Sequence, residues 1–214
     1  MRVPARLSRR WAPTIIVLAL AGCGGLFGGS SPAQLYRVTP VHAFPPGLPH
    51  LPVQVLIDEP LAPAGLDTTR IALSRSAVSI EYFADSEWTD RVPLMVQTAL
   101  LESFEDSKVL TAINRESLGF HADFILKTEI RHFEALYESP NGAPDVWVAI
   151  IARLVNLSGR DIVAQASFER HERATANEIP QIVLAFDEAL GGVMEDIVLW
   201  TVRNPAFSGK RRPL

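Results

Sequence analysis

The residue with the clearest chemical role in this sequence is Cys23, the only cysteine among 214 residues. Without a second cysteine the chain forms no intramolecular disulfide and no cluster of thiolate metal ligands. A cysteine thiolate is nevertheless a good nucleophile by itself. The side chains of Leu20, Ala21 and Gly22 become smaller toward Cys23, so the backbone there can enter a peptidase cleft. A lone cysteine after these small residues indicates that Cys23 has a special chemical role.

The four residues 20–23 resemble the lipobox of bacterial lipoproteins, and the residues before them have the anatomy of a signal peptide. Residues 1–11 are cationic, with four arginines and no acidic residue, and residues 12–20 are apolar. The apolar run is about half the ~20 residues that a membrane-spanning helix needs, which disfavours an uncleaved anchor. The resemblance implies a signal peptide of residues 1–22 and acyl chains on Cys23, which hold a protein stably on a membrane.

The residues after the cysteine bear on where the protein is anchored. Gly24 stands where an aspartate would suggest retention at the inner membrane in many bacterial lipoproteins, so the resemblance implies the periplasmic face of the outer membrane. Residues 24–33, GGLFGGSSPA, are typical of a flexible tether, and ten such residues span roughly 17 Å. We expect residues 23–34 to be the lipidated cysteine and its tether.

The charge of the mature chain argues against nucleic acid as a partner. The whole sequence has a net charge of −4, but four of its basic residues lie in the signal peptide. Without them, 16 basic and 24 acidic residues remain, a net charge of −8. Proteins that bind nucleic acid owe much of their affinity to the neutralisation of phosphates by basic patches. We therefore predict that nucleic acid is not a partner.

The sequence contains few other signals of chemistry. It shows no phosphate loop, no G-x-S-x-G elbow and no G-x-G-x-x-G fingerprint. The histidines lack the spacing of metal ligands on one helical face; they are His42, His50, His121, His132 and His171. Two carboxylate pairs, Asp187-Glu188 and Glu195-Asp196, could supply a general acid and base, but their positions favour the solvated face of a helix. We predict no catalytic residues, no metal, no cofactor and no enzymatic activity.

The tryptophans leave two interpretations open. Trp88, Trp147 and Trp200 could form a patch that contacts lipid, or they could pack in the core. Core packing is favoured, because the spacing of apolar residues around them is what a helix facing a core shows.

The apolar periodicity predicts a single domain over residues 35–203, followed by a basic tail over residues 204–214. Oxygen-bearing residues at Thr89 and Asp90, with Pro93 in the first turn, indicate the start of a helix that runs to about Glu105. A change of alternation near His132 indicates a β-bulge. Turn residues at 156–160 indicate a hairpin. The strands expected from alternation cover residues 36–41, 53–57, 70–73, 78–83, 124–131, 146–155 and 162–171, and a second helix covers 179–200.

These elements predict an α+β fold in which a mostly antiparallel sheet packs against two α-helices, both on one face. The edge strand expected at residues 36–41 could pair between copies of the chain, so a homo-oligomer is possible.

The body of the chain resembles a known family. The resemblance rests on Tyr36-Arg37-Val38, on residues 65–71 (GLDTTRI), on residues 80–93 (IEYFADSEWTDRVP) and on the strand at 126–133. From about Tyr36 to Trp200 it is similar to the auxiliary lipoprotein component of ABC-type transport systems, which accompanies mammalian-cell-entry-type lipid transporters in Gram-negative envelopes. The resemblance transfers no catalytic residue. Cys23 is therefore the one functional site that it implies.

The sequence as a whole predicts a non-enzymatic lipoprotein, anchored to the outer membrane, that assists an inner-membrane transporter in moving lipid or another hydrophobic compound. The alternative is a structural or assembly lipoprotein that binds cell wall or another outer-membrane protein. Both have the same anchor and tether, and they differ in their partner.

Overall fold

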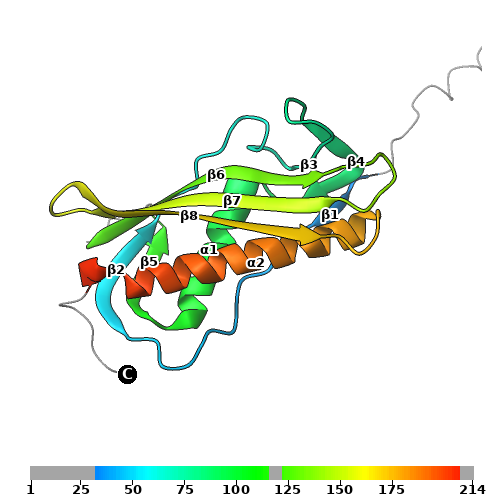
Figure 1. Ribbon diagram of the computed structural model, residues 1–214. Helices are drawn as coiled ribbons and strands as arrows, with labels where there is room; N and C mark the ends of the chain where they lie inside the picture. Colours follow the sequence, from blue (N-terminus) through cyan, green and yellow to red (C-terminus); the bar gives the residue numbers. More distant parts are fainter. Residues whose placement is uncertain (1–31, 116–121, 208–214) are drawn as a thin grey trace, which may run out of the picture. The chain divides into compact units, whose positions relative to one another are not determined.

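The computed structural model divides the chain into two units, residues 1–32 and 33–214, and describes residues 32–115 and 122–207 (Figure 1). Cys23, His121 and residues 208–214 lie outside the described residues. The described part contains eight strands, two α-helices and one short 3-10 helix: β1 (Gln34–Tyr36), β2 (Leu51–Ile57), β3 (Arg70–Ser74), β4 (Glu81–Trp88), α1 (Val92–Ser107), β5 (Leu110–Arg115), β6 (Phe124–Leu136), β7 (Asp145–Asn156), β8 (Asp161–Arg173), α2 (Ile179–Arg203) and η2 (Pro205–Phe207).

The sheet is organised around the long strand β6. One edge of β6 pairs antiparallel with β7 along its length, and β7 pairs antiparallel with β8. The other edge has two parallel partners, β2 at one end and β3 at the other. Beyond them, β5 and β1 also pair in parallel, with β2 and β4. The sheet is therefore mixed, and the prediction of a mostly antiparallel sheet was wrong, because hairpin signals reveal only pairings between strands that follow each other.

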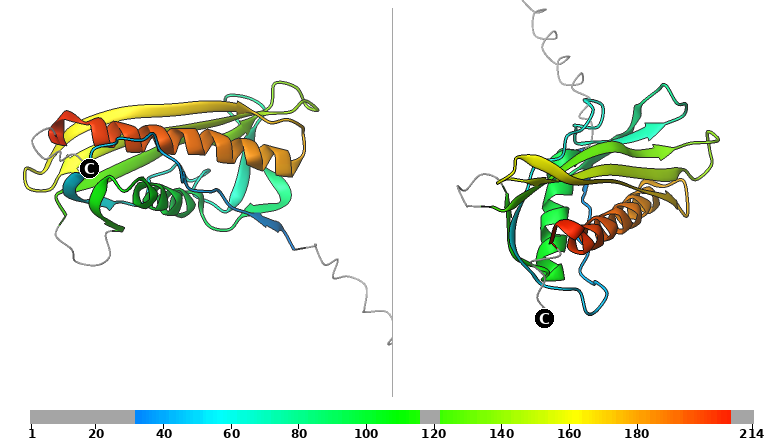
Figure 2. Two further views of the ribbon diagram at one scale, coloured as in Figure 1. Left: turned by 90° about the horizontal axis from the view of Figure 1, so that it is seen from below. Right: turned by 60° about the vertical axis from the view of Figure 1, so that its left-hand side comes forward.

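Both helices lie on the concave side of this curled sheet (Figure 2). Helix α2 packs against β7, β8 and α1, while α1 contacts β5. Pro93 stands in the first turn of α1, as predicted, because proline lacks an N–H that would be unsatisfied there. The predicted cap was wrong: Arg91 is the N-cap residue and makes no side-chain cap, while the Asp90 carboxylate accepts from the backbone N–H of Arg91. No helix among the described residues is long and apolar enough to cross a bilayer.

Three aromatic rings join the sheet to the longer helix. Trp88 of β4, Phe133 of β6 and Phe186 of α2 are each at most 1% exposed. Their ring centroids lie 5.7 Å (Trp88 to Phe133), 5.3 Å (Trp88 to Phe186) and 4.9 Å (Phe133 to Phe186) apart. Aromatic rings at such separations contribute packing energy beyond the area that they bury. This aromatic cluster connects elements from three distant parts of the sequence.

Hydrogen bonds attach the irregular stretch between β1 and β2 to the two helices. The Asp187 carboxylate accepts from the backbone N–H of Thr39 at 2.6 Å and from its hydroxyl at 2.8 Å. The Ser103 hydroxyl accepts from the backbone N–H of Val41 at 2.8 Å and donates to Ala99 O. Residues 37–41 therefore do not pair as a strand. The prediction of an edge strand at residues 36–41 was wrong, because β1 covers only the three residues Gln34–Tyr36.

Other predicted elements are confirmed. The hairpin of β7 and β8 and helix α2 lie where the periodicity placed them, and α2 ends before Asn204. The bulge is also confirmed, because the register of β6 against β7 shifts between Ile130 and His132. Strand β5 was not predicted. Beyond α2, η2 brings Phe207 into the core, where its ring centroid lies 4.7 Å from that of Phe124.

Candidate functional site on the outer face of the sheet

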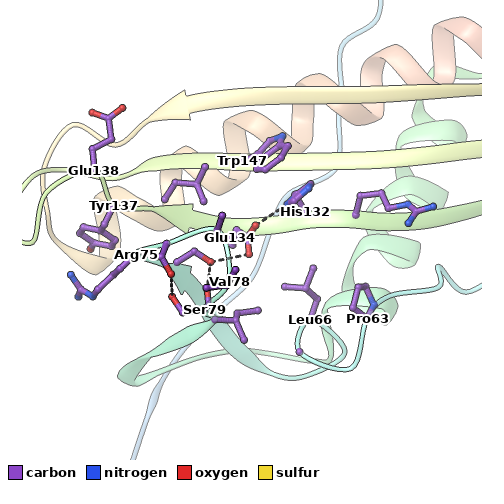
Figure 3. Close-up of a pocket in the computed structure, with 17 residues that line it drawn as sticks. Pro63, Leu66, Arg75, Val78, Ser79, His132, Glu134, Tyr137, Glu138 and Trp147 are labelled. Atoms are coloured by element: carbon purple, nitrogen blue, oxygen red, sulfur yellow. Dashed lines mark hydrogen bonds and ion pairs between the residues drawn. The ribbon is translucent and has the colours of Figure 1, made fainter.

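A cavity of about 670 Å³ lies on the face of β6 and β7 opposite the helices (Figure 3). Its floor includes His132, Glu134 and Leu136 of β6 and Trp147 of β7. Its walls are the loop of residues 75–80 between β3 and β4, and Pro63, Gly65 and Leu66 before β3. Concave sites of this size that combine apolar side chains with polar groups are typical of binding sites. The cavity is therefore the candidate site of the folded domain.

The loop between β3 and β4 carries apolar side chains at the cavity. Residues 78–83 were expected to form a strand with Val78, Ile80 and Tyr82 on one face. Residues 81–83 do belong to β4, but β4 begins at Glu81, so the prediction was wrong for residues 78–80. The loop turns back at its start, where the Ser79 N–H donates to Ser76 O and the Ser74 hydroxyl donates to Ser79 O. Val78 is consequently 96% exposed and Ile80 40% exposed.

A row of three rings crosses the outer face from β6 to β8. The bulge in β6 directs His132 to this face, while the next residue, Phe133, faces the core. His132 stacks on Trp147 with ring centroids 3.3 Å apart and an angle of 12° between the planes. His171 of β8, which is directly opposite Trp147 in the register, stacks on it at 5.2 Å and 21°. Trp147 therefore lies between two histidines that are far apart in the sequence.

Each of the two histidines has a carboxylate partner. His132 Nδ1 lies 2.8 Å from Glu134 Oε1, and His171 Nδ1 lies 2.6 Å from Asp145 Oδ2. The Ser74 hydroxyl, whose proton is shared with Ser79 O, lies 3.3 Å from the other oxygen of Glu134. These contacts hold the rings in place over the sheet. Within residues 32–115 and 122–207, no three histidine, cysteine, aspartate or glutamate side chains are grouped so that they could hold a metal ion.

Tyr137 forms one end of the cavity and connects it to the segment before α2. Its hydroxyl donates to Asn177 Oδ1 at 2.6 Å. Burial raises the pKa of Tyr137 above its ordinary value of 10.0, and the positive charge of Arg75, whose guanidinium lies 4.8 Å from the ring centroid, partly opposes the rise in pKa.

This raised pKa predicts a loss of stability at alkaline pH. The folded state holds the phenolic proton of Tyr137 more tightly than the unfolded state does. The contribution of this proton to the free energy of unfolding is therefore complete below about pH 10, and it is lost as the pH rises through the folded-state pKa. Tyr137→Phe should lose about 1 kcal/mol at neutral pH with the Asn177 hydrogen bond. Its stability should then fall less steeply than that of the wild type above about pH 10. Urea unfolding at a series of pH values measures both slopes, and equal slopes would contradict the assignment.

The carboxylates and histidines picked out in the sequence are mostly used in contacts that hold the domain together. Asp187 binds Thr39, and Asp196 forms an ion pair with Arg170 of β8. His42 Nδ1 lies 2.6 Å from Asp106 Oδ2 on α1. The sequence predicted that both carboxylate pairs lie on a solvated helix face. This prediction was wrong for one member of each pair, because Asp187 and Asp196 bind neighbouring elements.

The three tryptophans do not lie in one patch. Trp88 belongs to the core, and Trp200 packs on Phe168 with ring centroids 5.7 Å apart. Trp147 lies on the outer face instead. Sequence spacing did not indicate its place between His132 and His171, because three neighbouring strands bring these residues together.

Comparison with known proteins identifies the family of this chain. Residues 34–198 match the family of the ABC-type transport auxiliary lipoprotein component. The chain belongs to this family. The predicted family is thereby confirmed, and the match covers the folded domain from β1 into the last turns of α2. The role of the family is that of a lipoprotein that assists an ABC-type transport system.

Individual relatives support the same fold. The uncharacterized protein bll6063 of Bradyrhizobium diazoefficiens is 32% identical over 185 residues, which are 86% of this chain and 49% of that protein. The chain thus spans about half the length of this relative. Protein XCC0632 of Xanthomonas campestris superposes with a TM-score of 0.75 at 24% identity, over 81% of this chain and 97% of that structure. A second solved structure, of an uncharacterized protein, has a TM-score of 0.62 at 11% identity, over 80% and 99%.

Proposed function

We propose that this chain is a non-enzymatic, lipid-anchored auxiliary subunit of an ABC transport system of the mammalian-cell-entry type, which moves lipid or another hydrophobic compound between the two membranes. The observation that carries the proposal is the family match over residues 34–198. The mammalian-cell-entry association and the cargo go beyond that match. They are supported by the sequence resemblance at residues 80–93, which enclose β4 and the start of α1.

The anchoring part of the proposal assigns residues 1–22 to the signal peptide and residues 23–34 to the acylated Cys23 and its tether. The folded periplasmic domain covers residues 35–203 and the basic tail residues 204–214. Within the first residues of this tail, η2 packs Phe207 on Phe124. Gly24 supports sorting to the periplasmic face of the outer membrane. A tether of roughly 17 Å keeps the domain near that membrane, so its partner must extend across the periplasm to reach it.

The cavity on the outer face is the contact surface that we assign to the transporter subunit. Val78 and Ile80 are exposed apolar side chains on one side of it, and Trp147 and Tyr137 line the other side. Exposed apolar groups around a concave aromatic surface favour binding of a partner, because their burial contributes to affinity.

Photo-crosslinking in intact cells tests this function and its surface. A photoreactive amino acid at Val78 should capture a transporter subunit, which mass spectrometry identifies. The same amino acid at Leu184, which is 59% exposed on α2, is the matched control and should capture much less. Val78→Asp should weaken binding to the captured subunit by about tenfold, as loss of an apolar contact in an interface does, whereas Leu184→Asp should leave it unchanged.

The rival function predicts a different result from the same experiment. A structural or assembly lipoprotein would yield cell-wall material or outer-membrane assembly proteins at Val78, with no transporter subunit. That result would refute the proposed role even if the anchor and the fold were as described.

A further inference from the structure

Among the ion pairs of the described residues, the least exposed carboxylate is that of Glu134, which lines the outer-face cavity (Figure 3). Its side chain is 12% exposed. The contacts of this carboxylate are His132 Nδ1 at 2.8 Å and the Ser74 hydroxyl at 3.3 Å. A histidine carries a positive charge only when it is protonated, and a hydroxyl carries none. Within residues 32–115 and 122–207, no lysine or arginine forms an ion pair with Glu134.

Other carboxylates on the outer face are either paired with arginine or more exposed. Glu129, also on β6, lies 2.9 Å from Arg131 and 3.0 Å from Arg153. Asp145 has only a histidine as its partner, like Glu134, but its side chain is 28% exposed and does not line the cavity. A carboxylate that is removed from water loses hydration, which an opposite charge normally compensates. Glu134 is therefore the acidic group of this face that most needs a cation.

The two arginines that line the cavity are engaged elsewhere. Arg75 Nε lies 3.6 Å from Glu81, and the Arg75 guanidinium lies 4.8 Å from the ring centroid of Tyr137. Arg131 pairs with Glu129. An ionised carboxylate has about four acceptor positions, of which Glu134 uses two. The cavity thus contains a mostly buried acceptor of hydrogen bonds that a ligand can still reach.

Contacts within the chain fix the wall of the cavity opposite Glu134. The Tyr82 hydroxyl donates to Gly65 O at 2.9 Å, and the Arg70 guanidinium lies 3.6 Å from the ring centroid of Tyr82. Gly65 allows Ile80 to pack closely, since a Cβ at this position would lie 3.3 Å from Ile80 Cδ1. A ligand that enters a site already formed in this way loses less affinity to the ordering of loops.

We propose that the outer-face cavity receives a lysine or arginine side chain of the transporter subunit. Its charged group binds Glu134, and the apolar neighbours of that residue cover Val78 and Ile80. This inference rests on the function proposed above and adds the chemistry of the contact segment. Hydrogen bonds from a cationic donor to a carboxylate are among the stronger polar contacts in proteins. The aliphatic stem of a basic side chain also suits apolar walls.

The exposure of the cavity rim favours a protein segment over a small free cation. Val78 is 96% exposed and Ile80 40% exposed. A small cation on Glu134 would leave both side chains in water, whereas a segment that carries a basic residue between apolar ones buries them at the same time. The charge and the apolar rim are therefore both used by one occupant.

The yield of photo-crosslinking from Val78 in intact cells measures the role of the charge. Glu134→Gln keeps the size of the side chain and removes its charge, so capture of the transporter subunit should fall by about tenfold. Glu138→Gln makes the same change on the cavity lining, at a side chain that is 83% exposed, and should change capture by less than about twofold. Asp145→Asn, which removes the carboxylate beside His171 outside the cavity, should also have less than about a twofold effect.

A charge exchange identifies the basic residue of the subunit. Glu134→Lys should lower capture by more than about tenfold, because two cations would then meet in one site. Mass spectrometry locates the captured position, and each lysine or arginine near it is changed to glutamate in turn. One of these changes should restore capture by the Glu134→Lys chain to within about twofold of the wild type. If Glu134→Lys does not fold, the Glu134→Gln chain carries the test. Equal capture by the wild type and Glu134→Gln, or no restoring change, would overturn the proposal.

The results separate this contact from the role in transport. A transporter subunit captured equally by the wild type and Glu134→Gln would leave that role intact and refute the basic contact. A cell-wall or assembly protein whose capture depends on Glu134 would refute the role in transport and support the recognition of a basic side chain. Capture of no protein by any of the chains would overturn both.

Discussion

Cells that produce the Cys23→Ser chain should accumulate the full-length precursor and incorporate no acyl label into it. Serine differs by one atom, yet its hydroxyl ionises far less readily than a thiol and cannot form the thioether on which lipoprotein processing depends. The chain has no other cysteine to substitute for it. The effect should therefore be complete rather than partial, and the protein should lose the stable membrane attachment that we propose acyl chains on Cys23 provide.

Metabolic labelling with a fatty-acid probe measures this result, and fractionation of the membranes measures the attachment. Ser30→Ala, a change within the tether that leaves Cys23 intact, is the matched control and should label as the wild type does. Comparable label on the Cys23→Ser chain would rule out lipidation at this residue. Label on the wild type in the inner-membrane fraction alone would leave the lipoprotein assignment intact but contradict the outer-membrane location.

Phe186→Ala should destabilise the folded domain by about 3–5 kcal/mol, as truncation of a fully buried aromatic ring does. The ring contacts Trp88 and Phe133, so its removal leaves a cavity among elements that cannot all move inward together. Domains of this size have about 5–15 kcal/mol of stability, and the loss is therefore a large fraction of the total.

Denaturant unfolding of residues 33–214 measures the free-energy change, and the wild-type curve tests whether these residues unfold as one cooperative unit. Leu184→Ala is the control on the same helix, two residues away but 59% exposed, and should change the stability by at most about 0.5 kcal/mol. Similar losses for the two variants would contradict the packing of the aromatic cluster. A wild-type curve without a cooperative transition would contradict the single domain.

The features that could be predicted from the sequence are those made by neighbouring residues. The periodic apolar face of α2, the turn between β7 and β8, and the change of alternation at His132 all depend on residues a few positions apart, and the structure confirms them. The family could be predicted for the same reason, because the blocks that carry the resemblance, such as residues 80–93, are short and continuous. The family match over residues 34–198 confirms it. The prediction that Cys23 is acylated likewise depends on neighbouring residues, and the labelling experiment tests it.

The pairing of distant strands could not be predicted in this way. Strand β6 takes β2 and β3 as parallel partners on one edge, and nothing in the local pattern of any of these strands specifies that choice. The outer-face site depends on the same register: His132, Trp147 and His171 meet because three strands align them across the sheet. Alternation determines which face a side chain occupies, but only the packed sheet determines which side chain from a distant strand lies beside it.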